Sequence, residues 1–425
     1  MLTRAWAAVR SAARRHGRTG LLVVSGASVW MAACGRAGPG PLAPTGGEPV
    51  IRIGLVASAK FVRIKSDGDI AAFSGGQPAF RLNAGDSVVL LPSGMGIESR
   101  GRAGGRFETL SFTSMTPGRY VIVNGKPYRG AVEVIVRGDA LTAVNELGLE
   151  AYLLGVVSAE LGRRSALEVA AVAAQAVVSR TYALRNRGRM VANGFDLSAT
   201  TTDQAYGGVA AETPEGTVAV QNTRGQALTY HGEPIRAYFH STCGYETAEP
   251  EEAFRGLSDD PYLHSVSDKK PGGGYYCDIS PRFRWTVTWE GTQLRDILRR
   301  TLPATMGIAA AQVDTIHDVR VRRTGPSGRA AEIRIQVGGG EIPVFGPDIR
   351  TVFQQPTGDV LGSDAIQLSA EKVGGQLVRL TAAGAGWGHG VGLCQWGAVG
   401  RARAGQDYST ILSAYFPGAT LQRMY

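Results

Sequence analysis

The chain has 425 residues, of which 44% are hydrophobic and 19% are charged. This composition is typical of a globular protein and excludes an intrinsically disordered chain, while the length favours two or three domains. The net charge is +9, but the first 33 residues contribute five arginines and no acidic residue. The rest of the chain has 40 basic residues against 36 acidic ones, a balance too small to indicate a nucleic-acid-binding protein.

The N-terminus has the pattern of an export signal. A basic stretch precedes an apolar run at residues 21–33, which is too short to span a bilayer as a mature helix. Two alanines stand directly before Cys34, as in a bacterial lipobox, where the cysteine receives a lipid after cleavage. We therefore expect a lipoprotein signal peptide at 1–33 and a Gly/Pro-rich tether at 34–50. The alternative is an ordinary signal peptide cut nearby, with Cys34 incidental. Both interpretations place the protein outside the cytoplasm, and the first anchors it to the membrane through its N-terminal lipid only.

Short strands separated by turns are predicted for residues 51–140. Glycine and proline interrupt apolar or alternating runs, which is typical of a small β-rich domain. The runs that indicate strands are Ile51–Val56, Phe61–Ile64, Ser87–Leu91 and Ala131–Val136.

The pattern becomes helical at Leu147. Apolar residues recur at helical spacing as far as Glu160, and Gly162 marks the expected end of this helix. Ser165 and Glu168 then form a capping-box pattern at the start of an alanine-rich helix with a continuous apolar stripe. The later predicted elements are strands at 226–238, 318–323 and 332–337 and a helix at 291–301. The expected fold class is α+β, with a mixed core domain at 141–425 after the β-rich domain.

Glu160 is the first candidate for chemistry. It lies on the apolar face of its helix, in line with Leu153 and Val156 and near the helix C-terminus. Burial disfavours the carboxylate, and the negative end of the helix dipole does the same. This carboxyl group is therefore expected to stay protonated to a higher pH than a surface one, as a general acid requires. The alternative is a helix-terminal glutamate that turns outward to solvent.

Glycine occupies every second position from Gly386 to Gly392. If this segment is extended, one face has no side chains and the other presents Trp387 and His389. A bare face admits a flat sugar ring or another backbone, and the tryptophan beside it can stack on sugar. The alternative is a tight packing contact with the alanine-rich helix.

Cysteine and histidine suggest a possible metal site. His240, Cys243 and Cys277 could bind zinc, with a fourth position left for water or another side chain. The alternative is a Cys243–Cys277 disulfide with His240 as a hydrogen-bonding neighbour, which an oxidising compartment favours. A further cysteine, Cys394, follows the glycine-rich segment.

Several known motifs are absent from the sequence. It has no phosphate-binding glycine loop, no Gly-x-Ser-x-Gly elbow and no His-Glu-x-x-His run. These absences exclude the nucleotide-binding, serine-hydrolase and zincin classes.

A series of motifs occurs in order between Leu147 and Tyr425, over about two thirds of the chain. They are Glu150-Ala-Tyr-Leu-Leu-Gly-Val-Val-Ser-Ala-Glu160, Ala174-Gln-Ala-Val-Val-Ser-Arg-Thr-Tyr182, Thr202-Asp-Gln-Ala-Tyr-Gly207, Ala237-Tyr-Phe-His-Ser-Thr-Cys-Gly244, Gly386-Trp-Gly-His-Gly-Val-Gly392, Gln395-Trp-Gly-Ala398 and Tyr415-Phe-Pro-Gly418. In this order they resemble the SpoIID/LytB family, named for stage II sporulation protein D and an amidase enhancer.

The resemblance implies a lytic transglycosylase that acts on peptidoglycan glycan strands stripped of their stem peptides. Glu160, in the Ser-Ala-Glu motif, would be the catalytic acid for the bond between N-acetylmuramic acid and N-acetylglucosamine. The same residue would then deprotonate the muramic 6-hydroxyl as a 1,6-anhydro end forms. One carboxyl group suffices because no external water needs activation.

The family motifs also supply the predicted substrate-binding residues: Arg180, Tyr182, Gln204, Tyr206, Trp387, His389 and Gln395. Arg180 and Tyr182 could instead fix the long helix, and His389 could be a structural hydrogen-bonding residue. The reaction itself requires no cofactor. Some family members hold zinc through histidine and cysteine, so a structural zinc on the ligands suggested above stays open beside the disulfide.

Two positions depart from the family pattern: Cys394 stands where serine is usual, and Gly244-Tyr245 replaces a paired glycine. Neither departure affects Glu160. The main alternative function is a non-catalytic peptidoglycan-binding enhancer of a cell-wall amidase, which would tolerate loss of Glu160. A third is a zinc-dependent hydrolase that relies on His240 and Cys243.

Overall fold

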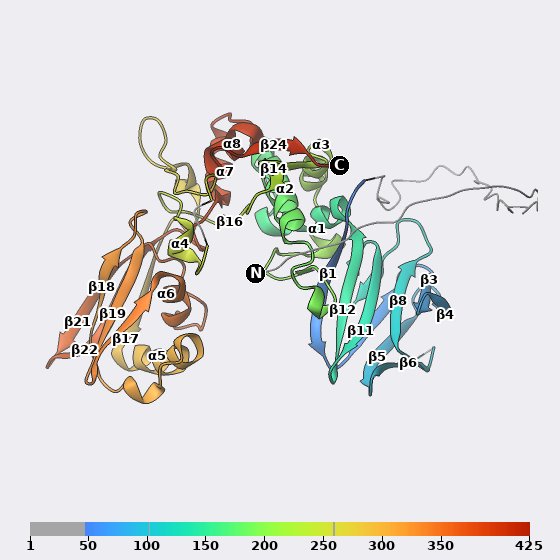
Figure 1. The fold of residues 1–425 in the computed structure, drawn as a ribbon, viewed down its shortest axis with the longest axis horizontal. Coiled ribbons are helices and arrows are strands. Elements are labelled where there is room, and N and C mark those ends of the chain that lie inside the picture. The colour runs from blue at the N-terminus through green and yellow to red at the C-terminus, as the bar shows by residue number, and fades with distance from the viewer. Residues whose placement is uncertain (1–46, 102, 258–259) are drawn as a thin grey trace, which may run out of the picture. The chain divides into compact units, whose positions relative to one another are not determined.

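The computed structural model describes residues 47–101, 103–257 and 260–425. The predicted signal peptide, Cys34 and most of the predicted tether lie outside the described residues. Among the described helices, none is long and apolar enough to cross a membrane. The α+β fold class is confirmed, because an antiparallel β region precedes a mixture of helices and strands (Figure 1).

Two sheets form the first part of the described chain. One sheet has the order β13-β1-β12-β11-β8-β3-β4 and the other β10-β9-β2-β5-β6-β7, and all neighbours pair antiparallel except the short β13 beside β1. The strands are β1 (Val50–Ala59), β2 (Val62–Ser66), β3 (Ile70–Ser74), β4 (Gln77–Leu82), β5 (Ser87–Ser93), β6 (Gly96–Gly101), β7 (Gly105–Phe107), β8 (Thr109–Ser114), β9 (Val121–Val123), β10 (Lys126–Tyr128), β11 (Ala131–Arg137), β12 (Ala140–Gly148) and β13 (Leu197–Ser198).

Alternating side chains explain why these runs form strands. In β2, Val62 and Ile64 are buried while their neighbours along the strand are exposed, as the two-residue period of a strand requires. The buried faces of both sheets belong to one hydrophobic core. The predicted boundary at residue 140 falls at the start of β12, a strand paired with both β1 and β11, and the division into domains stays a prediction.

The long alanine-rich helix α2 (Val169–Asn186) lies at the centre of the next part. It contacts α1 (Leu149–Leu161), and α1 follows β12 directly. The Ser165 N–H donates to Glu168 Oε2 at 2.9 Å, so the predicted capping box forms at the short 3-10 turn η1 (Ala166–Glu168). The elements that also contact α2 are α3 (Pro214–Asn222), α7 (Gln395–Arg403), α8 (Tyr408–Tyr415), β14 (Gln226–Tyr230) and β15 (Glu233–Pro234).

A second hydrophobic core lies among elements that follow residue 284. Helix α5 (Gly291–Met306) packs on β22 (Gln376–Ala385), and α6 (Gly346–Val352) packs on β19 (Ala330–Val337). The sheets of this part have the orders β17-β22-β21 and β18-β19-β20. The remaining strands here are β17 (Arg284–Glu290), β18 (Ile316–Thr324), β20 (Gly340–Phe345) and β21 (Ile366–Val373).

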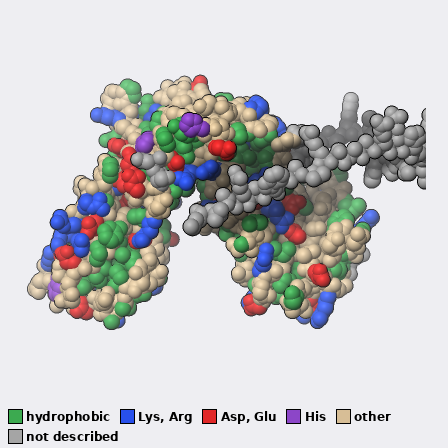
Figure 2. All heavy atoms as spheres, viewed as in Figure 1, with side chains coloured by type: hydrophobic (Ala, Val, Ile, Leu, Met, Phe, Trp, Pro, Cys, Tyr) green, Lys and Arg blue, Asp and Glu red, His purple; other side chains and the backbone are tan. Residues whose placement is uncertain are grey.

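Short elements connect these parts and supply much of the candidate site. They are η2 (Val191–Asn193), η3 (Gly208–Ala211), β16 (Phe239–His240), α4 (Pro250–Ala253), η4 (Tyr276–Ile279), η5 (Ala310–Gln312), β23 (Leu393–Cys394) and β24 (Thr420–Arg423). β16 pairs in parallel with β23, which brings the His240 region beside the end of the glycine-rich segment. On the face drawn in Figure 2, Lys and Arg are interspersed with Asp and Glu rather than gathered in one stripe.

Candidate functional site

Glu160 lies in the last turn of α1, where the sequence predicts a helix end. Gly162 follows with a positive φ of 72°, and its N–H donates to the Ser158 carbonyl at 2.9 Å. The Glu160 Oε1 atom accepts a hydrogen bond from the Ala205 N–H at 2.6 Å. Burial raises the pKa of Glu160, although hydrogen bonds from Ala205 and Gln395 act in the opposite direction. The carboxyl group therefore has the electrostatic setting that a general acid requires.

Glu160 faces a cleft of about 560 Å³. The walls come from segments far apart in the sequence: the end of α1, α2, the loop at 201–203, β16, α6 and the glycine-rich segment. The lining residues are Glu160, Tyr182, Thr201, Thr202, Asp203, Tyr238, Phe239, His240, Ser241, Phe254, Arg282, Arg350, Trp387, Gly388, His389 and Gln395. The structure thus brings Tyr182, Trp387, His389 and Gln395, four of the predicted substrate-binding residues, together with Glu160.

Asp203 holds the loop that carries Ala205. Its carboxylate is buried and accepts hydrogen bonds from the Ser198 N–H at 2.8 Å and the Tyr182 hydroxyl at 3.0 Å, and it also pairs with Arg189. Because these partners occupy both carboxylate oxygens, Asp203 positions the cleft wall. It lies within the Thr202–Gly207 motif, so the sequence contained a signal for this residue, although none of the predicted roles falls on it.

Three predicted substrate-binding residues do not line the cleft. The Arg180 guanidinium is fully buried and forms a two-bond ion pair with Glu150, with N···O distances of 2.7 Å. The Tyr206 hydroxyl donates to Asn145 Oδ1 at 2.8 Å, and Gln204 Oε1 accepts from the Tyr152 hydroxyl at 3.3 Å. These partners hold all three side chains inside the protein, outside the described lining of the cleft.

The glycine-rich segment is not an extended strand. Gly386, Gly388, Gly390 and Gly392 all have positive φ, between 73° and 114°, so the segment has no continuous bare face. A Cβ atom on Gly392 would lie 2.2 Å from the Tyr238 carbonyl oxygen. The glycines allow residues 238–248 to approach closely. The tight packing contact that the sequence suggested is therefore made with this segment and not with the alanine-rich helix.

His389 has both ring nitrogens engaged within the protein. Its Nε2 donates to the Phe239 carbonyl at 2.8 Å, and its Nδ1 accepts from the Val391 N–H at 3.1 Å. Burial, with the nearby His240, lowers the pKa of His389 to about 3. The ring is therefore a neutral hydrogen-bonding residue that fixes the cleft wall.

His240 presents a different arrangement in the same wall. Its Nδ1 donates to the Val391 carbonyl at 3.1 Å, which leaves Nε2 as an acceptor. That atom is buried and has no hydrogen-bond partner among the described residues. Burial, together with the nearby Arg329 guanidinium, lowers the pKa of His240 to about 3, so the imidazole is neutral.

Two arginines in the cleft were not singled out from the sequence. The Arg282 guanidinium lies over the Trp387 ring, 4.4 Å from its centroid. Arg350, from α6, donates from Nε to the Leu361 carbonyl at 2.9 Å and also lines the cleft. Neither stands in a motif that resembles a known family, so the sequence offered no signal for them.

The chain is similar to known proteins over much of its length. A family model described as SpoIID, stage II sporulation protein, matches residues 137–230, and a second, described as a domain of unknown function (DUF8618), matches residues 236–392. The chain is 31% identical to an uncharacterised protein of Brachyspira hyodysenteriae, over 70% of this chain and 73% of that one. The chain belongs to the SpoIID family.

Relatives of this SpoIID family member carry two kinds of name. Stage II sporulation protein D of Bacillus subtilis is 27% identical, over 68% of this chain and 79% of that protein. The amidase enhancer of the same organism is 28% identical, over 63% of this chain but only 40% of its own length. The family is therefore established, while the names of the relatives differ in the activity that they describe.

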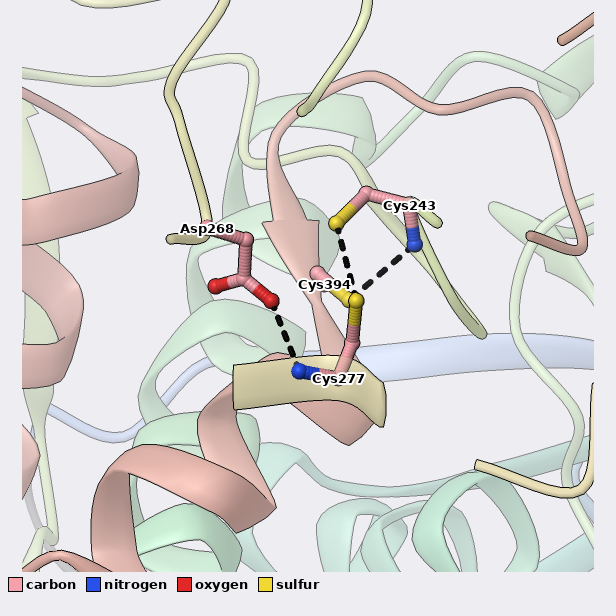
Figure 3. A group of neighbouring side chains, drawn as sticks. All are labelled: Cys243, Asp268, Cys277 and Cys394. Atoms are coloured by element: carbon pink, nitrogen blue, oxygen red, sulfur yellow. Dashed lines mark hydrogen bonds between the residues drawn. The ribbon is translucent and has the colours of Figure 1, made fainter. Parts of the chain in front are cut away.

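The cysteines of this SpoIID protein form a buried cluster that the sequence anticipated only in part. One ligand atom each from Cys243, Cys277, Cys394 and Asp268 lies within 4.8 Å of all the others. Figure 3 shows the three cysteine side chains converging from separate segments, with the Asp268 carboxylate beside them. A cluster of this composition could hold a metal ion such as zinc.

Two parts of the sequence prediction for this region need correction. His240 is not in the cluster, because its ring is directed to Val391 and the cleft. Cys243 and Cys277 do not form a disulfide, because their sulfur atoms are 3.5 Å apart, well beyond the bonded distance of about 2.05 Å. Cys394 and Asp268 join them instead.

Proposed function

We propose that this SpoIID protein is a lytic transglycosylase that cleaves peptidoglycan glycan strands between N-acetylmuramic acid and N-acetylglucosamine. The observation that carries the proposal is the partly buried carboxyl group of Glu160 in a cleft large enough for sugar rings. The Glu160 Oε1 atom accepts a hydrogen bond from the Ala205 N–H, and the carboxyl group faces the cleft, where a substrate can reach it.

The proposed reaction uses Glu160 twice. Its carboxyl proton passes to the glycosidic oxygen as the bond from that oxygen to the muramic anomeric carbon breaks. The resulting carboxylate then takes the proton of the muramic 6-hydroxyl, whose oxygen bonds to the anomeric carbon and gives a 1,6-anhydro end. No water is consumed, and Glu160 recovers its proton.

The carboxyl groups that line the cleft support a mechanism that uses a single acidic residue. Asp203 is the other carboxylate in the described lining, and the Ser198 N–H, Tyr182 and Arg189 already occupy it. Glycosidases that activate water need a second carboxylate. A cleft with one available carboxyl group fits intramolecular attack by the substrate's own hydroxyl.

The cations of the cleft support an anionic sugar as substrate. A muramic acid residue without its stem peptide has a free lactyl carboxylate. Arg282 and Arg350 provide guanidinium groups in the lining, and Trp387 provides a flat ring beside Arg282. Arginine binds carboxylates through paired N–H donors, so these residues favour peptide-stripped strands over strands that retain an amide at that position.

The test is mass spectrometry of peptide-stripped glycan strands incubated with the full chain or its Glu160→Gln variant. We expect 1,6-anhydro-muramic ends with the wild-type protein, and a rate about 100-fold to 10,000-fold lower with the variant, because general acid–base catalysis contributes that much. Glu251→Gln, at an exposed residue of α4, is the matched control and should keep full activity.

Two other outcomes would contradict the proposal. New reducing ends formed with water would indicate a hydrolase. Intact strands with both proteins, with strand binding retained and faster cleavage by an added cell-wall amidase, would indicate an enhancer, the role in the name of the Bacillus subtilis relative.

A further inference from the structure

A second hollow lies on the surface of the β-rich part of the chain. This β2 groove has a volume of about 560 Å³ and is lined by Phe61, Arg63, Lys65, Ile122, Asn124 and Gly125. None of these residues lines the cleft that Glu160 faces. The groove is therefore a separate candidate for a binding site.

Strand β2 and the residue before it supply three of the lining residues. Val62 and Ile64 are buried in the hydrophobic core, so the side chains at 61, 63 and 65 lie on the solvent face of the sheet. Phe61 is 53% exposed, and a single exposed apolar residue needs no explanation by itself. Here the ring shares a concave site with two cations, Arg63 and Lys65. That combination suits a ligand that has both an apolar face and negative charge.

The β2 groove is positively charged. Its lining contains two basic residues and no carboxylate. Arg63 lies opposite Val89 of β5, and Lys65 lies between Ser87 of β5 and Ile122 of β9, so no acidic residue pairs with either position across the sheet. In the described ranges of the chain neither cation forms an ion pair. Both charges are therefore available to an anionic ligand.

Hydrogen bonds fix the shape of the groove before any ligand binds. The turn between β9 and β10 is Asn124-Gly125, and both residues have a positive φ, 48° and 88°, as a tight two-residue hairpin turn requires. The Asn124 N–H donates to the Arg63 carbonyl, and Asn124 Oδ1 accepts from the Arg63 N–H, both at 2.9 Å. The turn is thus fixed to β2, and a preformed site loses less entropy when it binds a ligand.

We propose that the β2 groove is a second, non-catalytic binding site for an anionic glycan, namely a peptide-stripped strand with free muramic carboxylates. Arg63 and Lys65 bind the carboxylates through charged N–H donors. The Phe61 ring packs on the apolar face of a sugar ring, and the Asn124 amide donates to a sugar hydroxyl. The identity of the polymer rests on the proposed function, whereas the binding itself requires no cleavage.

The construction of the groove favours a polymer strand over a membrane surface. Proteins that lie on a bilayer typically insert the apolar face of an amphipathic helix, whereas this site is a hollow made by a strand and a tight turn. A glycan strand also repeats its carboxylate along its length, so the groove can hold the strand while the cleft is empty. Binding at two sites on one chain raises the effective concentration of the strand at each.

The test is sedimentation of the full chain with insoluble peptide-stripped glycan strands, with Glu160→Gln in every protein so that no strand is cleaved. Arg63→Gln/Lys65→Gln should weaken binding about 10-fold at low salt, the effect of two exposed ion pairs. This difference should shrink in high salt, which screens exposed charges. Phe61→Ser should weaken binding about fivefold at either salt concentration, because it removes a ring and not a charge.

Arg81→Gln/Arg322→Gln is the matched control. These two arginines are exposed on β4 and β18, so their substitution removes the same charge outside the groove and should leave binding unchanged. The melting temperature of each variant reports the fold. A wild-type protein that binds strands without cleaving them would contradict only the proposed function, because binding is measured here without cleavage.

Two results would overturn the proposal. The first is equal glycan binding by the groove variants and the control pair. The second is a groove variant that keeps its affinity for glycan but no longer binds phosphatidylglycerol vesicles, which would assign the groove to a membrane surface.

Discussion

The imidazole of His240 is buried in the cleft wall, and burial lowers its pKa to about 3, so the ring is neutral. The ring donates from Nδ1 to the Val391 carbonyl and leaves a buried Nε2 acceptor in the cleft wall, with no hydrogen-bond partner in the part of the chain that the structure describes. A buried acceptor without a partner is costly, and a substrate hydroxyl or amide that donates to it would remove that cost.

We expect His240→Asn to weaken glycan binding by roughly fivefold, the equivalent of one hydrogen bond of about 1 kcal/mol. The asparagine amide can keep the donor to the Val391 carbonyl, at the position of Nδ1, but it provides no acceptor at the position of Nε2. Sedimentation of the protein with insoluble glycan strands measures the affinity, and the melting temperature reports the fold. Unchanged binding with an unchanged melting temperature would show that Nε2 does not contact the substrate.

At the scale of elements, the glycine-rich segment depends on conformations that only glycine adopts easily. Gly392 has a φ of 73°, and its missing side chain makes room for the Tyr238 carbonyl beside β23. Gly405, just after α7, also has a positive φ of 84°, but a Cβ atom there would meet nothing within 4 Å. A comparison of alanine substitutions at these two positions therefore separates the cost of backbone strain from the cost of a steric clash.

Gly405→Ala should destabilise the protein by about 1 kcal/mol, the strain of a left-handed alanine. Gly392→Ala should cost about 1–3 kcal/mol more, because the backbone must also move apart. Urea denaturation of both variants measures the difference. Equal losses would mean that the contact with Tyr238 relaxes without cost.

Local signals explain which elements could be predicted. The helix end at Gly162 and the capping box of Ser165 and Glu168 depend on neighbouring residues, and both form as the sequence indicates. The shape of the glycine-rich segment could not be read in the same way, because glycine adopts either sign of φ at little cost. The segment 238–248 that it contacts is about 150 residues away, and periodicity carries no information about such a contact.

Contacts between distant segments also limit what the sequence can predict about the cleft and the cysteine cluster. Glu160 could be proposed from the sequence because its motif is local, and its place on an apolar helix face predicts the raised pKa that the structure gives it. Cys394 and Asp268 join Cys243 and Cys277 only through the pairing of β16 with β23 and the position of η4. Spacing along the chain therefore predicted two of the four residues, Cys243 and Cys277, and added His240, which lies outside the cluster.

At the scale of the whole molecule, a buried charge network joins the beginning and the end of the mixed core. Glu150, in the first turn of α1, pairs with Arg180 in the middle of α2, and both are at most 1% exposed. Arg180 also donates to the Gln226 carbonyl at 3.1 Å, and the hydroxyl of the last residue, Tyr425, donates to Glu150. The network thus links α1, α2, β14 and Tyr425.

Arg180→Met should destabilise the protein by about 3–5 kcal/mol, because it leaves the Glu150 carboxylate buried without its cation. Arg100→Met, which removes an exposed partner of Glu98, is the matched control and should leave the melting temperature unchanged. The double variant Arg180→Met/Glu150→Gln should regain part of the lost stability, because a neutral amide is cheaper to bury than an unpaired charge. If the double variant is no more stable than Arg180→Met in urea denaturation, the loss comes from packing around the guanidinium, and the electrostatic account of this network is wrong.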